Sequence, residues 1–384
     1  MHWKTRLLHT GAKVPEGFRS LVTPVYRGST VVFERQADAH DDWRTNTEGY
    51  AYGLFGTPTV LELAARIAEL EGARHTFLVP SGLAAISLVY LSCCKAGDHV
   101  LLPWSAYGPN LALKRLMSRL GVEVETYDPM SVDDMAGRIR ANTALVWAES
   151  PGSITMEVQD VPAIVSAAHA RGTLVALDNT YAAGVLFDAF GAGVDISIQA
   201  LTKYAGGHSD LLMGSVSVRD EAMYQQVGTT RRWLGMGVSP DAASLALRGL
   251  QTMALRLDRY EKAALEVARW MQQQPQVARV LHPALPDCPG HELWKRDFQG
   301  SASLFSVVFA AGITPEQVAA FADALELFEA GYSWGGVRSL VMTYPTRRDL
   351  SKRYGGELLR LNIGLEEPAD LILDLRRAFE QLQE

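Results

Sequence analysis

Short apolar runs alternate with amphipathic stretches along the chain from residue 57 onward. The apolar runs have the length of strands, and they are continuous rather than alternating, which is typical of a sheet covered on both faces. Between them, apolar residues recur at helical spacing, as in residues 58–71, where Gly72 ends the pattern. The predicted strands of this part are residues 76–79, 99–102, 122–127, 144–148, 174–177, 196–200 and 214–218. Strands alternating with helices predict an α/β fold with a mainly parallel central sheet and helices on both faces.

The last third of the chain shows a different order of elements. A long helical pattern covers residues 242–273 and ends before Pro275. Strand-like runs and helices then mix without strict alternation, which favours a smaller α+β domain. Its predicted strands and helices are residues 278–281, 304–309, 358–363, 315–328 and 368–382. We therefore expect three parts: an N-terminal arm (1–56), an α/β domain (57–247) and a C-terminal α+β domain (248–384).

Composition and charge narrow the class of protein. The chain has 384 residues, a net charge of −7 and 21% charged residues, so neither nucleic acid nor an anionic membrane surface is an expected partner. The N-terminus lacks the apolar core of a signal peptide, and no apolar run approaches the ~18 residues of a membrane span. The cysteines are three, two of them adjacent, which predicts reduced thiols and a cytoplasmic protein.

Several common chemistries lack their motifs in this sequence. No G-x-G-x-x-G follows a predicted strand, and no G-x-x-x-x-G-K-[ST], H-E-x-x-H or G-x-S-x-G is present. No cysteine spacing indicates a metal site, so no metal is expected. The α/β fold therefore needs another cofactor.

Three points on the predicted sheet indicate which cofactor. The turn Ser81-Gly82-Leu83 links a strand to a helix and could bind phosphate through open backbone N–H groups, although a plain tight turn looks the same. Asp178 follows one apolar strand, where it could also cap a helix, and Lys203 follows the next, where it could also reach solvent. Pyridoxal phosphate needs a lysine, a carboxylate and a phosphate cradle, so the three together favour it. Tyr107 follows another strand and could stack on the ring.

A family resemblance rests on motifs spread over nearly the whole chain. They are YGLFGTPT (52–59), SGLAA (81–85), ESPGSITMEV (149–158), DNTYAAG (178–184), TKYAGGHSD (202–210), YSWGG (332–336) and RLNIG (360–364). With these motifs the sequence resembles the Cys/Met-metabolism family of fold-type I pyridoxal phosphate enzymes. Within the family it is most similar to the bacterial cystathionine β-lyase branch, because of residues 151–153 and Trp334, where γ-acting relatives usually differ.

The resemblance implies a role for each matching residue. Lys203 would bind the cofactor as a Schiff base and shuttle protons, with Asp178 on the pyridine nitrogen and Tyr107 stacked on the ring. The phosphate would be held by Ser81, Gly82, Leu83 and Thr202. The substrate carboxylate would be bound by Arg360, with Ser333 and Trp334 lining its site. Tyr52, on the N-terminal arm, would enter the active site of a neighbouring subunit, which implies a homo-oligomer, expected to be a tetramer built from dimers.

One position departs from the family pattern. Relatives commonly carry an arginine two residues after the tyrosine of the arm, where it binds the cofactor phosphate across the subunit interface. Here that position is Leu54, which cannot make a charge-assisted hydrogen bond. Arg27 and Arg44 lie in the same arm and are candidates to replace it.

The resemblance implies a carbon–sulfur β-lyase that cleaves L-cystathionine to homocysteine, pyruvate and ammonia in methionine biosynthesis. Three alternatives remain open at this point. The first is a γ-acting relative, such as a methionine γ-lyase or cystathionine γ-synthase, and the second is a broad cysteine-S-conjugate β-lyase. The third is of another class, a regulatory protein that binds pyridoxal phosphate with little turnover.

Overall fold

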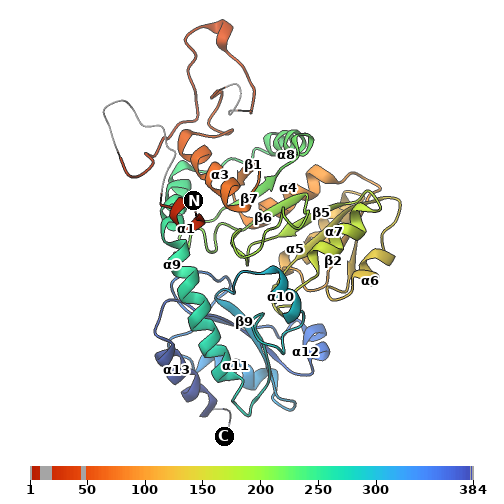
Figure 1. Cartoon of the computed structure of the whole chain (residues 1–384), viewed down its shortest axis with the longest axis vertical. Coiled ribbons are helices and arrows are strands. Elements are labelled where there is room, and N and C mark those ends of the chain that lie inside the picture. The colour runs from red at the N-terminus through yellow and green to blue at the C-terminus, as the bar shows by residue number, and fades with distance from the viewer. Residues whose placement is uncertain (1, 9–19, 45–48, 381, 383–384) are drawn as a thin grey trace.

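Two sheets, joined by a long helix, organise the chain in the computed structural model, which describes residues 2–8, 20–44, 49–380 and 382 (Figure 1). The larger sheet has seven strands and comes first in the sequence. Its strands are β1 (His75–Val79), β2 (His99–Pro103), β3 (Glu123–Tyr127), β4 (Thr143–Glu149), β5 (Leu174–Asp178), β6 (Ile196–Gln199) and β7 (Gly214–Val218).

The strand order of this sheet is β1-β7-β6-β5-β4-β2-β3. β7 runs antiparallel to both of its neighbours, and the remaining pairs are parallel, so the predicted mainly parallel sheet is confirmed. Because β2, β4, β5 and β6 point the same way, their carboxyl ends meet along one edge. Ligands of open α/β sheets bind at that edge.

Helices cover both faces of the larger sheet. On one face, α4 (Gly82–Cys93), α5 (Gly108–Arg119) and α8 (Glu221–Trp233) bury apolar side chains against the strands. On the other face lie α3 (Pro58–Glu71) and α7 (Val161–His169). α3 shows how the sequence sets such a helix: Pro58 occupies its first turn, and Gly72 ends it in the left-handed conformation with φ of 66°. A short helix, α6 (Val132–Gly137), contacts α7.

The second sheet has five strands in the order β10-β11-β12-β9-β8. They are β8 (Val277–Leu281), β9 (Leu304–Phe309), β10 (Glu329–Ala330), β11 (Leu340–Thr343) and β12 (Leu358–Asn362). Its helices are α10 (His291–Asp297), α11 (Pro315–Asp323), α12 (Arg348–Tyr354) and α13 (Pro368–Glu380). Phe309, Phe321 and Phe379 pack against one another in its core between β9, α11 and α13, with their rings tilted or edge to face. This second sheet and its helices form the smaller α+β domain that the sequence predicts.

Helix α9 (Pro240–Met271) runs along both the part that contains the larger sheet and the smaller domain (Figure 1). It contacts α3 beside the larger sheet and α13 beside the smaller one. Ser239 caps its first turn by accepting the N–H of Asp241. The domain boundary expected at 247/248 lies inside this helix, and the three-part division stays a prediction.

One predicted helix is too long. The pattern at residues 315–328 predicts helix to Phe328, but α11 ends at Asp323. The N–H groups of Glu326 and Leu327 instead donate to the buried carboxylate of Asp374 on α13, at 2.8–3.2 Å. A tertiary hydrogen-bond acceptor therefore ends the helix, and the local pattern cannot show it.

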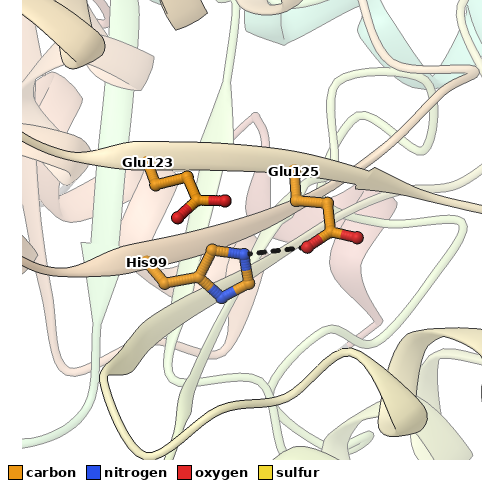
Figure 2. A group of neighbouring side chains, drawn as sticks. All are labelled: His99, Glu123 and Glu125. Carbon is orange, nitrogen blue, oxygen red and sulfur yellow. Dashed lines mark ion pairs between the residues drawn. The ribbon is translucent and has the colours of Figure 1, made fainter.

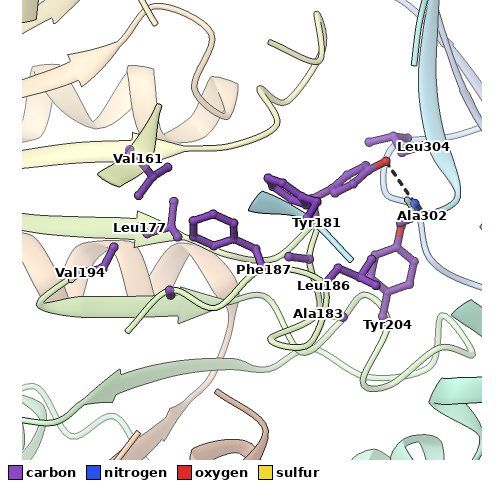
Figure 3. Close-up of a cluster of buried hydrophobic side chains, with 14 of the residues drawn as sticks. Val161, Leu177, Tyr181, Ala183, Leu186, Phe187, Val194, Tyr204, Ala302 and Leu304 are labelled. Carbon is purple, nitrogen blue, oxygen red and sulfur yellow. Dashed lines mark hydrogen bonds between the residues drawn. The ribbon is translucent and has the colours of Figure 1, made fainter. Parts of the chain in front are cut away.

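One of the apolar clusters contains side chains from both the larger sheet's part of the chain and the smaller domain, and Figure 3 shows part of it. Tyr181 extends from the larger layer, and its hydroxyl accepts the backbone N–H of Ala302 at 3.1 Å. The buried hydroxyl of Tyr204 likewise accepts the N–H of Ser303 at 3.1 Å. Tyr204 directly follows Lys203, so these contacts fix the position of Lys203 relative to the smaller sheet.

The N-terminal segment differs from the rest of the chain. Helix α1 (Trp3–Arg6) is attached to α9 by an ion pair between Lys4 and Asp258 at 2.6 Å. The middle of residues 20–44, which includes the short 3₁₀ helix η1 (Gln36–Asp38), extends away from the body as a loop (Figure 1). The ends of this segment contact the body, because the N–H of Tyr26 donates to Thr59 on α3 and Trp43 is buried against Phe77 and Tyr224. In the same segment, Leu21 and Val32 are almost fully exposed. No helix in the described part of the chain combines the length and apolar character needed to cross a bilayer.

Candidate active site

A cavity of about 170 Å³ opens at the carboxyl edge of the larger sheet, beside the smaller domain. Eight of the residues predicted for the site line it: Ser81, Gly82, Leu83, Tyr107, Asp178, Thr202, Lys203 and Trp334. They come from the end of β5 and from loops and helix starts that follow β1, β2 and β6, together with one loop of the smaller domain. The structure thus gathers side chains that are up to 253 positions apart in the sequence.

Lys203 lies in the loop after β6 and points to the smaller domain. Its Nζ donates to Ser333 Oγ at 2.5 Å and lies 5.3 Å from the ring centre of Trp334. Burial lowers the pKa of this amine to about 8, the positive charge of Arg360 adds to the effect, and Asp178 opposes it. At pH 7 roughly a tenth of the amine is therefore uncharged, far more than for a lysine with the usual pKa of about 10.4, and the uncharged form is the one that a nucleophile and proton acceptor requires.

The lowered pKa predicts how Lys203 reacts in the protein freed of any cofactor. When a small amount of an acylating reagent is added, the rate at which Lys203 is labelled should rise with pH up to about 8 and then stay constant, because the uncharged amine is the reactive form. A free lysine derivative such as Nα-acetyllysine, added to the same solution, should instead continue to gain reactivity towards the usual lysine pKa of about 10.4. Mass spectrometry measures the labelling of both, and equal profiles for Lys203 and the free lysine derivative would contradict the assignment.

Asp178 is the last residue of β5 and is buried. Its Oδ1 accepts both the N–H and the hydroxyl of Thr180, at 3.1 and 2.5 Å. Burial raises the pKa of Asp178, while Thr180 and the Lys203 amine hold it down. A buried carboxylate with one oxygen fixed in this way suits a protonated ring nitrogen as its partner, because the cation would restore its charged form.

The turn into α4 can receive a phosphate. Ser81 is the N-cap of α4 and accepts the N–H of Ala84 at 3.0 Å, so the N–H groups of Gly82 and Leu83 begin the helix without intrahelical acceptors. A Cβ on Gly82 would come within 2.6 Å of the Cβ of Ala200, so only glycine permits this close approach. The hydroxyl of Thr202, two residues after Ala200, also lines the cavity, and it donates to the carbonyl of Met213 and accepts its N–H. These residues fit the phosphate of pyridoxal phosphate.

Arg360 projects from β12 as a buried guanidinium. It donates to the carbonyl of Ser153 at 3.1 Å and lies 5.3 Å from the ring centre of Tyr344. Among the described residues, no carboxylate is within ion-pair distance of it. Burial lowers the pKa of Arg360, and an incoming carboxylate would offset that cost. Neither Arg360 nor Ser333 is among the residues that line the cavity, and the binding of a substrate carboxylate by Arg360 stays a prediction.

Glu149 is a site residue that the sequence reasoning missed. It ends β4 directly beside Asp178, lines the cavity, and its Oε2 accepts the N–H of Tyr107 at 2.8 Å. The predicted strand stopped one residue earlier, at Ala148. The rule that selected Asp178, a polar residue at the carboxyl end of an apolar strand, would also have found Glu149.

Tyr52 does not line this cavity. It lies half exposed on the arm, in an isolated bridge with Thr30 and in edge contact with Phe55. The two arginines considered as replacements at Leu54 are both paired within the chain: Arg27 with Asp241, and Arg44 with Asp42. The structure thus gives no support to either as the phosphate ligand.

Leu54→Arg tests whether a phosphate anchor is missing. With Arg27 and Arg44 engaged, we expect the new guanidinium to tighten cofactor binding by roughly tenfold to a hundredfold, the value of one charge-assisted contact. Titration of the cofactor-free protein measures the affinity, and Leu54→Met controls for the change in packing. Unchanged or weaker binding by the arginine variant would mean that another cation already neutralises the phosphate.

A second group of chemically capable side chains lies far from this cavity, on β2 and β3. Figure 2 shows His99, Glu123 and Glu125, whose ligand atoms all lie within 4.8 Å of one another. Arg140 pairs with both glutamates, at 2.8 and 2.5 Å, and Arg138 pairs with Glu125. The ring of His99 contacts Thr143 Oγ1 at 2.9 Å. Ion pairs already neutralise the carboxylates, so this group needs no metal to explain it.

Comparisons with known proteins identify the family and the fold class. Residues 4–380 match the model of a family described as "Cys/Met metabolism PLP-dependent enzyme". A "putative cystathionine beta-lyase" of Rhizobium johnstonii is 45% identical over 98% of this chain and 95% of its own length. The "cystathionine beta-lyase" of Bordetella avium is 41% identical over 99% and 98%. The crystal structure of metB from Corynebacterium glutamicum superposes with a TM-score of 0.91 at 30% identity, covering 100% and 98%. The resemblance and fold class expected from the sequence are confirmed.

Proposed function

The chain belongs to the Cys/Met metabolism family of PLP-dependent enzymes, and we propose that it is a carbon–sulfur β-lyase that acts on L-cystathionine. The products would be homocysteine, pyruvate and ammonia, with one water consumed, and the reaction would serve methionine biosynthesis. The observation that carries the proposal is the cavity in which Lys203, Asp178 and Trp334 meet the loop of residues 151–153. Relatives named cystathionine β-lyase at near-full coverage support it.

Each residue of the site has its own role in this reaction. Pyridoxal phosphate, when bound, supplies an electron-accepting ring that stabilises negative charge at the substrate Cα. Lys203 holds the cofactor and, as a free amine, takes the Cα proton, with Ser333 orienting its Nζ. Asp178 stabilises positive charge on the ring nitrogen, and Arg360 binds the substrate α-carboxylate.

Tyr107 completes this set. Burial and the neighbouring carboxylates raise the pKa of its phenol, so the group keeps its proton near neutral pH in the free protein. Its place in the wall of the cavity allows its ring to stack on the cofactor and its oxygen to exchange a proton with the substrate amine. Loss of the β-thiolate then leaves a three-carbon fragment that water converts to pyruvate and ammonia.

Product analysis tests the proposed function. Purified holoenzyme is incubated with L-cystathionine, and the keto acid and the thiol are identified by mass spectrometry. Pyruvate with homocysteine is the expected pair. 2-Oxobutyrate with cysteine would show a γ-acting enzyme, and no keto acid would favour a regulatory protein. A higher kcat/KM for cystine or for other cysteine S-conjugates than for cystathionine would favour the broad β-lyase.

We also propose a homo-oligomer in which Tyr52 completes a neighbour's cavity. The exposure of Tyr52 and the loop that extends from the body support this arrangement (Figure 1).

The three free thiols are in keeping with a cytoplasmic location, which we propose as well.

Mixing of inactive variants tests the shared site. Lys203→Ala and Tyr52→Ala subunits, unfolded and refolded together at equal amounts, should recover about a quarter of wild-type activity, because half of the dimers carry one intact site. The control mixes Lys203→Ala with Asp178→Ala. Both residues come from one protomer, so no site is restored. Equal recovery in the two mixtures, or none in either, would contradict the shared site.

A further inference from the structure

Glu149 is a buried carboxyl of the cavity to which the proposed reaction gives no role. It is 7% exposed and is the register partner of Asp178 on the neighbouring strand. Its own backbone N–H donates to the side chain of Gln159 at 2.9 Å, which fixes the end of β4. A buried ionisable group costs free energy unless its contacts offset the loss of hydration. The contacts of the Glu149 side chain must therefore offset the cost of burying it.

The side chain of Glu149 contacts the backbone of Tyr107. Its Oε2 accepts the Tyr107 N–H at 2.8 Å, just where the chain enters α5. Tyr107 is the N-cap residue of that helix, and no side chain caps the helix there. The phenol ring extends from this same residue and lines the cavity beside Asp178. The hydrogen bond from Glu149 therefore bears on where the ring of Tyr107 lies.

The contact matters as a hydrogen bond rather than as a fixed charge. Burial raises the pKa of Glu149 well above its usual range, and the neighbouring Asp178 raises it further. The Tyr107 N–H and Arg360 act in the opposite direction. Two adjacent buried carboxyls do not both ionise readily, yet a carboxyl oxygen accepts a hydrogen bond in either form.

We propose that Glu149 is a positioning residue that holds the backbone of Tyr107, so that its phenol ring keeps its place in the wall of the active-site cavity. The inference rests on the proposed function only in taking Tyr107 to work in catalysis. A glutamine keeps an acceptor oxygen at this position and an alanine does not. The two substitutions therefore separate the hydrogen bond from the charge.

The first test uses the cofactor-free protein and needs no activity. Amide hydrogen exchange is measured at Tyr107 in wild type, Glu149→Ala and Glu149→Gln. We expect the Tyr107 amide to exchange about tenfold faster in the alanine variant, because the loss of one hydrogen bond corresponds to a change of about that size. In the glutamine variant the exchange rate should be close to that of wild type. Unchanged exchange in the alanine variant would overturn the proposal, whatever reaction the enzyme catalyses.

The second test is a double-mutant cycle on the holoenzyme. Glu149→Ala should lower kcat/KM by at least about tenfold and change the visible circular dichroism of the bound cofactor, and Glu149→Gln should restore most of both. In a Tyr107→Ala background, Glu149→Ala should cost little more. Additive losses, or a glutamine variant as poor as the alanine variant, would contradict action through Tyr107.

Asp374 provides the matched control. It is also a buried carboxylate that accepts backbone N–H groups, but it lies on α13 in the smaller domain. Asp374→Asn should leave the exchange rate at Tyr107 and the circular dichroism of the cofactor as in wild type. A change in either would show that they respond to general destabilisation, which would count against the proposal.

Discussion

Replacing Lys203 by alanine is expected to lower kcat by at least ~1,000-fold, because the same amine holds the cofactor and moves the Cα proton. The structure places it where both tasks are possible, in the cavity, with its Nζ 2.5 Å from Ser333 Oγ. Steady-state pyruvate formation measures the loss. A small external amine such as ethylamine should restore part of the activity, since the cavity left by the side chain can admit it.

The control for this change is Lys295→Ala, at a surface lysine paired with Glu292 on α10. Its kcat should equal that of wild type, because surface ion pairs contribute little. A Lys203→Ala enzyme that retains a tenth or more of its activity would exclude Lys203 as the essential amine.

Arg360→Ala should raise KM for cystathionine by on the order of 100-fold or more, because it removes a buried charge-assisted contact to the substrate carboxylate. The absorption spectrum of the bound cofactor should change little, since the cofactor contacts come from other elements. Arg360→Lys should restore only part of the affinity. A lysine cannot reproduce the planar, bidentate donor geometry of a guanidinium.

The control for Arg360 is Arg296→Ala, which removes an exposed guanidinium paired with Asp160 and Asp297. Its KM should be that of wild type. If Arg360→Ala also leaves KM unchanged, its contacts with Ser153 and Tyr344 serve the fold alone.

The part of the site on the larger sheet was predictable from local pattern. Asp178 and Lys203 each follow a buried apolar strand, and parallel strands bring their carboxyl ends to one edge. The turn at Ser81-Gly82-Leu83 obeys the same rule, although β1 is joined to the parallel strands only through the antiparallel β7. Glu149 escaped because the predicted strand ended one residue too early.

Other parts depend on contacts that local pattern does not contain. Arg360 on β12 and Ser333 in the loop between β10 and β11 come from the smaller domain, where Ser333 accepts a hydrogen bond from Lys203, and only the family motifs indicated their place. Ser333 also has a φ of 98°, a conformation that side-chain-bearing residues rarely adopt and that no propensity scale predicts. Helix α8 was not predicted either. Its sequence is rich in polar residues, and packing against α4 stabilises it.

The central claim is that this cavity holds pyridoxal phosphate on Lys203. Borohydride reduction of the holoenzyme, followed by proteolysis and mass spectrometry, tests it most directly, because reduction fixes the cofactor on the amine that carries it. We expect a pyridoxyl group on the peptide that contains Lys203 and on no other. A label on any of the other seven lysines of the chain, or no label at all, would contradict it.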